Sequence, residues 1–160
     1  MPELNKDSNY INNDSRSRSF YEAVYTIGVA SEKIGISDHS LRLYESEGLI
    51  IPHKTKTGRR LYSDLDLEKV LCIKQMIKEE GLNFEGIRRL LSLVPCWKIR
   101  NCNSDNGAKC KSYMNRTKPC WDTEEKCLNP LESCRDCTVY KSLVNCDDVE
   151  SYIKEKQVKL

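Results

Sequence analysis

Apolar residues recur at helical spacing in four segments of residues 25–94, and a capping residue stands before each segment. Capping side chains accept a hydrogen bond from the first turn of a helix; here they are Thr26, Ser37, Ser63 and Asn83. Helix-ending residues follow the segments in turn: Gly35, Gly48, Gly81 and Pro95. The pattern predicts four helices, of which the first two, joined by a tight turn, form a helix-turn-helix unit.

Residues 49–63, LIIPHKTKTGRRLYS, break the helical pattern. An apolar run and a second apolar pair flank a cationic loop around Gly58, which predicts a two-stranded hairpin, or wing. Pro52 has no N–H donor, so it fits near the edge of the first strand. In the helix after the wing, we expect one face to be made of Leu67, Leu71 (or Val70), Lys74 and Ile77.

The composition is that of an ordinary globular chain. With 160 residues, 39% of them apolar, it can form one domain or two small ones around a modest core. No apolar run approaches the roughly 20 residues of a spanning helix, and residues 1–24 lack the apolar centre of a secretion signal. These 24 residues hold few large apolar groups, which predicts a disordered leader. We expect a cytoplasmic protein with no membrane contact.

The net charge is only +2, so the distribution of charge must indicate any partner. From His53 to Arg60 there are four cations and no acidic residue. A helix-turn-helix can place its second helix in the major groove of double-stranded DNA while a basic wing follows the phosphates. A solvated loop would explain the charges alone, but the order of the elements favours DNA. The expected DNA contacts are His39, Ser40 and Arg42 on the second helix and Lys54, Lys56, Arg59 and Arg60 in the wing.

The order YTIGVASEKIGISDHSLRLYESEGLIIPHKTKTGRRLYSDLDLEKV resembles the DNA-binding domain of the MerR family of bacterial transcription regulators. The resemblance covers residues 25–94, and LRLYE with EGLNFEGIRRLL is most similar to the heat-shock repressor (HspR-like) branch. It implies a homodimeric regulator, not an enzyme, that binds an inverted-repeat operator; RNA polymerase or a chaperone would be a further partner. By this resemblance, the DNA-contacting positions are Ser40, Arg42, Tyr44, Arg59, Arg60 and Tyr62, and Leu43 replaces a usual tyrosine.

The chain departs from the family after the fourth helix. Pro95 interrupts the long helix by which many members dimerise, and no apolar heptad follows. Instead, a cysteine pattern occurs twice. The first copy is Cys96-Trp97, Cys102, Cys110 and Tyr113; the second is Cys120-Trp121, Cys127, Cys137 and Tyr140, with Cys134 added. Over residues 95–141 this order resembles the two-CW cysteine-rich module of bacterial sensory proteins.

Nine cysteines in a cytoplasmic chain indicate metal ligands or reactive thiols. The candidate ligands are Cys96, Cys102, Cys110, Cys120, Cys127, Cys134 and Cys137, which could hold zinc or an iron–sulfur cluster, or act as disulfides or thiols without metal. Cys72, at an apolar helical position, is expected to be a small core residue, and Cys146 has no evident partner. We expect each tryptophan to pack over its own sulfur cluster.

The sequence therefore predicts a mainly α protein. A winged helix-turn-helix of four helices and a two-stranded wing occupies residues 25–94, and a small irregular cysteine-rich module occupies 95–146. Residues 147–160 form a short tail whose amphipathic pattern predicts a short helix. We expect a DNA-binding regulator whose module senses metal or redox state. The alternative is a repressor whose module is a zinc-stapled docking surface for a protein. A thiol oxidoreductase using Cys134 and Cys137 is disfavoured, because no thioredoxin-like context surrounds them.

Overall fold

The computed structural model describes residues 19–102, 110–114, 116–123, 127 and 133–154. The predicted leader up to residue 18 and the last six residues of the chain lie outside these ranges. The end of that leader lies against the folded chain: Leu65 N donates to Phe20 O (3.2 Å) and Val24 N donates to Tyr62 O (2.9 Å).

The four predicted helices are present: α1 (Ile27–Ile34), α2 (Asp38–Ser46), α3 (Asp64–Lys78) and α4 (Phe84–Ser92). All four predicted caps are confirmed. The side chains of Thr26, Ser37 and Asn83 each accept a backbone N–H from the first turn of the helix that follows. Ser63 and Asp66 form a reciprocal capping box at the start of α3. Gly35 ends α1 in the left-handed conformation (φ 61°), which a glycine adopts without a steric penalty.

The wing is part of a three-stranded antiparallel sheet, ordered β1-β3-β2. Strand β2 (His53–Lys54) and strand β3 (Arg60–Tyr62) form the predicted hairpin, and β1 (Tyr25–Thr26) adds a third strand that the sequence pattern did not indicate. In register, Tyr25 lies opposite Tyr62 and His53 lies opposite Leu61. The first wing strand begins after Pro52, not in the apolar run before it, because that run is drawn into the core.

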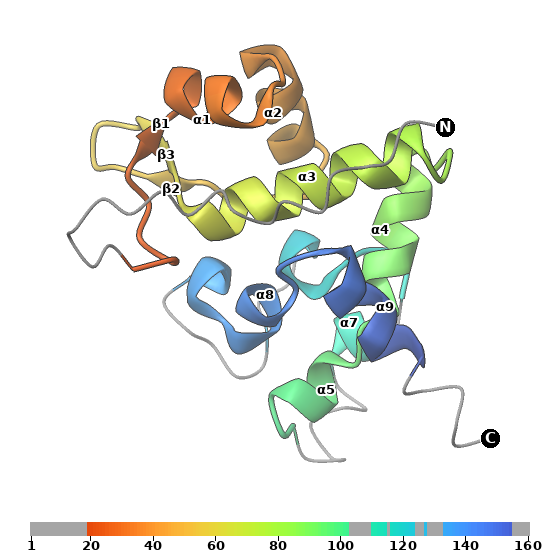
Figure 1. Ribbon diagram of the computed structural model, residues 1–160. Coiled ribbons are helices and arrows are strands. Elements are labelled where there is room, and N and C mark those ends of the chain that lie inside the picture. Colours follow the sequence, from red (N-terminus) through yellow and green to blue (C-terminus); the bar gives the residue numbers. More distant parts are fainter. Residues whose placement is uncertain (1–18, 103–109, 115, 124–126, 128–132, 155–160) are drawn as a thin grey trace.

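The predicted face of α3 is confirmed in part: Leu67 and Val70 are buried and Ile77 packs against the core, but two predicted positions are wrong. Leu71 is exposed, and the Lys74 ammonium reaches out to the carbonyl of Gly35 (3.4 Å). The buried face also contains Leu65, Ile73 and Met76, which were not predicted, together with the polar Asp66 and Lys69. Burial of this wider face follows from the position of α3, which is covered from two sides (Figure 1).

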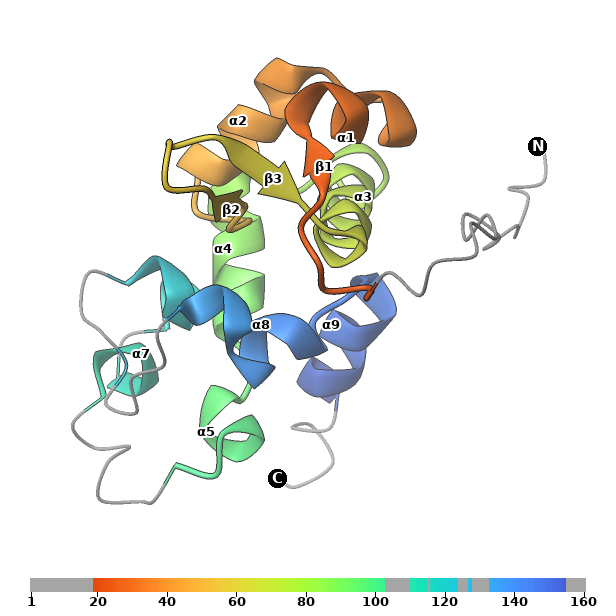
Figure 2. The same cartoon turned by 90° about the vertical axis from the view of Figure 1, so that its left-hand side faces the viewer.

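The cysteine-rich half consists of short helices. They are α5 (Cys96–Ile99), α7 (Lys111–Met114), the 3-10 turns η1 (Cys120–Asp122) and η2 (Cys134–Asp136), α8 (Thr138–Ser142) and α9 (Cys146–Lys154). Figures 1 and 2 show α8 and α9 on the side of α3 opposite α1 and α2. The expected tail helix is confirmed as part of α9. No helix longer than α9 follows α4 in the described part of the chain.

One hydrophobic core serves both halves. Leu41, Tyr62 and Ile87 from the first half belong to the same buried cluster as Leu143 and Val149 from the second. The cysteine-rich half therefore covers apolar surface of the winged helix-turn-helix, and this shared core fixes the cysteine-rich half against α3.

Candidate nucleic-acid interface and the module behind it

Helix α2 presents a polar face to solvent. His39 and Arg42 are exposed, and Ser40 is half-buried, with its hydroxyl 3.0 Å from that of Ser37. The opposite face is anchored by Leu41, which is fully buried. Asp38 at the start of α2 accepts a hydrogen bond from the Ser31 hydroxyl of α1 (2.6 Å), so the two helices are held at a fixed angle. The N-terminal part of α2 can thus enter a groove with its side chains directed outward.

The wing carries its cations around a tight turn. Gly58 has φ 81°, a conformation that favours glycine, and its N–H donates to Thr55 O (2.9 Å). Lys56 and Arg59 are exposed on this turn. They are suited to phosphate contacts, which position a protein on DNA without reading bases.

Glu45 of α2 ties the wing to the second helix. Its carboxylate forms ion pairs with Arg60 and with Lys54, the latter at 3.1 Å. Although burial raises the pKa of Glu45, the hydrogen bonds from Arg60 and Lys54 outweigh it and hold that pKa below its usual value. The predicted contacts Lys54 and Arg60 therefore also align the wing with α2, so that both can approach the same duplex.

Two predicted contacts are buried. Tyr44 is 7% exposed and packs edge-to-face on Phe84, and Tyr62 is fully buried. The Tyr62 hydroxyl has no hydrogen-bond partner among the described residues, and burial raises its pKa to about 12. In this conformation both tyrosines stabilise the core of the domain instead of presenting a hydroxyl to DNA.

The segment that joins α2 to the wing, residues 48–51, is called the connector here. Three side chains from the described part of the cysteine-rich half form hydrogen bonds with it. The Trp121 indole N–H donates to Gly48 O (2.9 Å), the Tyr140 hydroxyl accepts from Ile51 N (2.8 Å), and the Arg135 guanidinium donates to Ile51 O. Gly48 has φ 71°, and a Cβ there would lie 2.2 Å from an Asp122 carboxylate oxygen. The connector therefore has little room to move independently of η1.

A buried ion pair joins the two halves. The Arg135 guanidinium makes two hydrogen bonds to the Asp66 carboxylate, at 2.6 and 2.8 Å, and a third to the Ser63 hydroxyl (3.0 Å). Asp66 is fully buried, and the Tyr140 hydroxyl also donates to it (3.4 Å). Because Asp66 and Ser63 form the capping box of α3, Arg135 is attached to the first turn of that helix. The sequence pattern did not indicate this role for Arg135.

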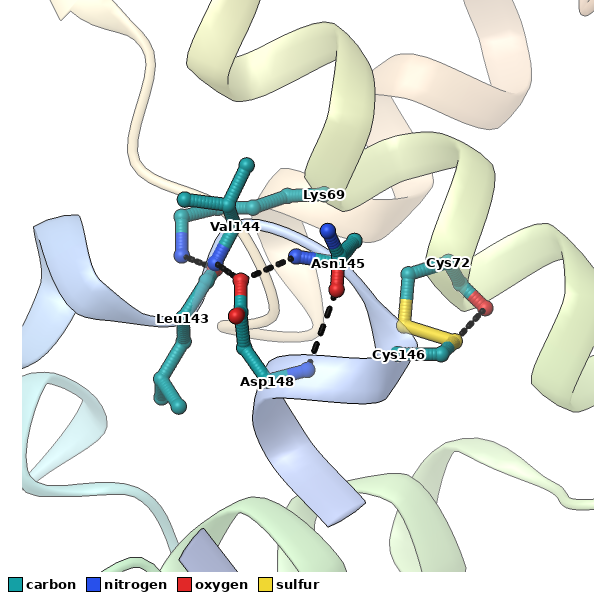
Figure 3. Close-up of a disulfide and its surroundings, with 7 residues drawn as sticks. All are labelled: Lys69, Cys72, Leu143, Val144, Asn145, Cys146 and Asp148. Carbon is teal, nitrogen blue, oxygen red and sulfur yellow. Dashed lines mark hydrogen bonds between the residues drawn. A yellow bond between two sulfur atoms is a disulfide. The ribbon is translucent and has the colours of Figure 1, made fainter. Parts of the chain in front are cut away.

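A disulfide forms a further joint. Cys72 of α3 is bonded to Cys146 at the start of α9, with the Cα atoms 5.2 Å apart (Figure 3). This corrects two expectations: Cys72 is buried as predicted but is not a simple apolar residue, and Cys146 has a partner. Close by, Asp148 accepts hydrogen bonds from the backbone N–H groups of Val144 and Asn145 (3.0 and 3.1 Å).

Lys69 lies beside that disulfide on α3. Its ammonium donates to Leu143 O and lies 4.3 Å from the centre of the Tyr140 ring. Burial lowers the pKa of Lys69 to about 7, although the charges of Asp66 and Asp148 act in the opposite direction. Lys69 thus fixes the turn between α8 and α9 against α3.

The sequence repeat is also a repeat of ring packing. Trp97 lies edge-to-face on Tyr113, with ring centres 5.0 Å apart, and Trp121 lies in the same way on Tyr140 at 5.3 Å. Arg116 stacks over Trp97 at 4.3 Å. Each tryptophan therefore packs on the tyrosine of its own copy, where we had expected a cluster of sulfurs.

Seven cysteines are unbridged. The Cys120 thiol shares a hydrogen bond with Cys96; this bond, with backbone N–H groups and the charge of Arg116, lowers the pKa of Cys96 to about 7 against the effect of burial. The same contact raises the pKa of Cys120, which is also near Cys134 and Cys137. Within the described ranges, no three His, Cys, Asp or Glu side chains are grouped to hold a metal ion. Zinc or iron–sulfur binding stays a prediction.

An open pocket of about 460 Å³ lies where the connector meets the module. Its walls include Glu45, His53, Trp121, Ser133 and Arg135.

In the described part of the chain, no helix is long and apolar enough to cross a membrane.

Comparison with known proteins covers mainly the first half. Residues 25–93 match the sequence profile described as MerR HTH family regulatory protein. A Streptomyces coelicolor protein that carries the name of the heat shock protein HspR is 36% identical over 85 residues, which are 50% of this chain and 56% of that protein. GlnR, an HTH-type transcriptional regulator of Bacillus cereus, is 37% identical over 68 residues, 42% of this chain and 52% of GlnR.

The chain thus spans about half the length of these two relatives. A longer but weaker likeness extends into the second half. The mercuric resistance operon regulatory protein of Bacillus cereus is 26% identical over 134 residues, 82% of this chain and 98% of that protein.

Proposed function

Because residues 25–93 form a MerR-type winged helix-turn-helix domain, we propose that this chain is a dimeric transcription regulator of an inverted-repeat operator, controlled by its cysteine-rich half. In this proposal, α2 reads bases through Arg42 and its neighbours, and the wing binds phosphates through Lys56 and Arg59. Residues 95–146 respond to metal or redox state and change the affinity for DNA.

The observation that carries the proposal is the contact of the module with the connector. Trp121, Arg135 and Tyr140 all bind backbone atoms of residues 48–51, which lie between the two DNA-binding elements. A change in the module alters the position of α2 relative to the wing, and hence how well both fit one duplex. Coupling between two such sites is typically worth about 1–3 kcal/mol, or about 5–150-fold in affinity.

DNA reading is tested with a duplex enriched from a randomised library by the full-length protein. Arg42→Ala is expected to abolish the preference for that duplex, because a base-reading side chain is lost. Arg59→Ala is expected to weaken binding to all duplexes and to reduce the salt dependence of the binding constant by about one phosphate contact. Lys78→Ala is the matched control, since Lys78 is exposed at the far end of α3 from the wing. Failure to enrich any duplex would contradict the proposal.

The effector role is tested separately on protein purified without oxygen. Its metal content and visible spectrum are measured first, and the affinity for the enriched duplex is then measured before and after a chelator and before and after an oxidant. We expect one of these treatments to change the affinity at least about fivefold. Equal affinity in every state would contradict sensing.

A purely structural role for the module is the second candidate. The bidentate Arg135–Asp66 pair and the Cys72–Cys146 disulfide favour it, because both fasten the module to α3. In that case the module is a docking surface for a protein partner, such as RNA polymerase or a chaperone, and the cysteine state leaves DNA affinity unchanged.

A further inference from the structure

The Cys72–Cys146 disulfide is the one cross-link among the described cysteines, and it joins the two halves of the chain. Cys72 lies in α3 of the winged helix-turn-helix, and Cys146 is the first residue of α9 (Figure 3). A protein that acts on DNA as proposed works in a compartment whose thiols are kept reduced, and disulfides found there are usually transient or redox-sensing. The bond is therefore placed to be a reversible link between the halves.

The surroundings of the bond can accommodate the reduced state. The Cys146 sulfur lies 3.4 Å from the carbonyl oxygen of Cys72, so a free Cys146 thiol has a hydrogen-bond acceptor already in place (Figure 3). A cavity of about 20 Å³ borders Cys72, which is room for about one water molecule. Two thiol sulfurs cannot lie at the roughly 2.0 Å of a disulfide, and this space allows them to separate without displacing a packed side chain.

The same cavity extends to the connector. Its walls include Leu49 of the connector and Trp121 of η1, together with Val149 of α9. Trp121 also donates its indole N–H to Gly48 O. A shift of the Cys72 side chain into this space is therefore transmitted to the residues that join α2 to the wing.

The bond also restrains the segment that carries Tyr140. Cys146 follows six residues after Tyr140, whose hydroxyl accepts a hydrogen bond from Ile51 N (2.8 Å). The turn between them is also held to α3 by the hydrogen bond from Lys69 to Leu143 O. Reduction removes the covalent part of this attachment, so Tyr140 holds the connector less firmly.

We propose that the Cys72–Cys146 disulfide is a redox switch, and that its reduction by a dithiol weakens DNA binding through the connector. The inference rests on the proposed function, since it names the redox-sensitive bond of the same protein. A thiolate of the dithiol attacks the Cys146 sulfur, forms a mixed disulfide and releases Cys72, which takes up a proton. The second thiol of the reductant then attacks the first and releases Cys146 as a thiol. Two electrons pass to the protein, and the dithiol becomes a disulfide.

Access to the bond depends on α9. Both cysteines are less than a tenth exposed, so a reductant reaches the sulfurs when α9 opens. In this helix Cys146 and Val149 are buried, and Tyr152 and Ile153 are partly buried against the core. Opening an element that buries so little apolar surface costs less than global unfolding, so the winged helix-turn-helix stays folded while the bond is reduced.

The first test follows the bond itself. Full-length protein purified without reductant is incubated with or without dithiothreitol, alkylated, digested without reductant and examined by mass spectrometry. We expect a peptide pair linked through Cys72 and Cys146, which dithiothreitol converts to two alkylated peptides while circular dichroism shows that the protein stays folded. No link, a link on a different pair, or a link that opens only when the whole protein unfolds in urea would overturn the proposal.

The second test measures the effect on DNA. A duplex enriched from a randomised library by the untreated protein is titrated with untreated and with reduced protein, and we expect reduction to raise the dissociation constant at least about fivefold. The double variant Cys72→Ala/Cys146→Ala should bind like the reduced protein and ignore dithiothreitol. Cys127→Ala, the matched exposed-thiol control, should respond like the natural protein.

The outcomes separate the two proposals. Unchanged affinity after reduction of the natural protein would overturn the switch even if the double variant is too unstable to measure. A double variant that still responds to dithiothreitol would overturn it too, because the response would then come from other cysteines. Failure of the untreated protein to enrich any duplex would contradict the proposed function, and the mapping of the bond would stand.

Discussion

The Cys72–Cys146 disulfide should contribute a large part of the stability. It closes a loop with a sequence separation of 74 residues. In the chain-entropy description, a cross-link of that span removes enough freedom from the unfolded state to stabilise the fold by about 4 kcal/mol at 25 °C. With an m-value of about 2 kcal/mol/M, its loss would lower the urea midpoint by about 2 M.

The assay is equilibrium unfolding in urea, followed by circular dichroism, with and without a phosphine reductant. Reducing the natural protein breaks the bond without changing any side-chain volume, so it isolates the cross-link from packing. We expect the reductant to lower the midpoint of the natural protein by about 2 M, and the double variant Cys72→Ala/Cys146→Ala to be insensitive to it.

Cys127→Ala is the control, because its thiol is exposed and unbridged, and its response should equal that of the natural protein. Two results would refute the reasoning. One is a midpoint that reduction leaves unchanged, which would mean that α9 is held by its other contacts alone. The other is a double variant that still responds to the reductant, which would place the stabilising bond on a different pair.

Three further predictions concern the joints between the two halves. Arg135→Met should cost about 3–5 kcal/mol in urea unfolding, because it leaves the Asp66 carboxylate buried and unpaired, and the double variant Asp66→Leu/Arg135→Met should recover much of that loss. Gly48→Ala should lower thermal stability for two reasons: the new Cβ meets Asp122, and the backbone φ is 71°. Adding Asp122→Ala should remove the clash and leave only the backbone cost of about 1–2 kcal/mol. Full recovery of stability in the double variant would contradict a separate backbone cost. The pKa of Lys69 is lowered to about 7 in the folded state, so between that pH and 10.5 the unfolded state binds more protons than the folded state. The free energy of unfolding should therefore rise with pH across this window. Lys69→Met should flatten that rise, and an equal slope in both proteins would exclude Lys69 as its cause.

Local signals in the sequence predicted local structure well. Ser37 and Asn83 act through the N–H groups of the next few residues, and Gly35 through its own backbone, so their roles depend on nothing distant. Part of the α3 face was misjudged, because Leu71 and Lys74 were assigned to it by helical spacing alone. Which side of α3 is covered depends on α8 and α9, which are far away in the chain.

The joints could not be predicted for the same reason. Arg135 and Asp66 are separated by 69 residues, and nothing in either neighbourhood indicates the other. Cys72 and Cys146 likewise each stand alone in their own segment. The exposed DNA-binding candidates were within reach of the sequence because they follow a linear motif, whereas the burial of Tyr62 depends on how the sheet meets the core.

The shared hydrophobic core has a consequence for how this protein can be engineered or can diverge. Leu143 and Val149 belong to the same buried cluster as Leu41 and Ile87, so residues 25–94 do not form a separate unit that can be joined to another effector unchanged. A truncation after residue 94 would leave the underside of α3 exposed to water, and a chimera carrying another effector would need to supply an equivalent apolar cover. Unfolding should accordingly be a single cooperative transition, with both halves lost together.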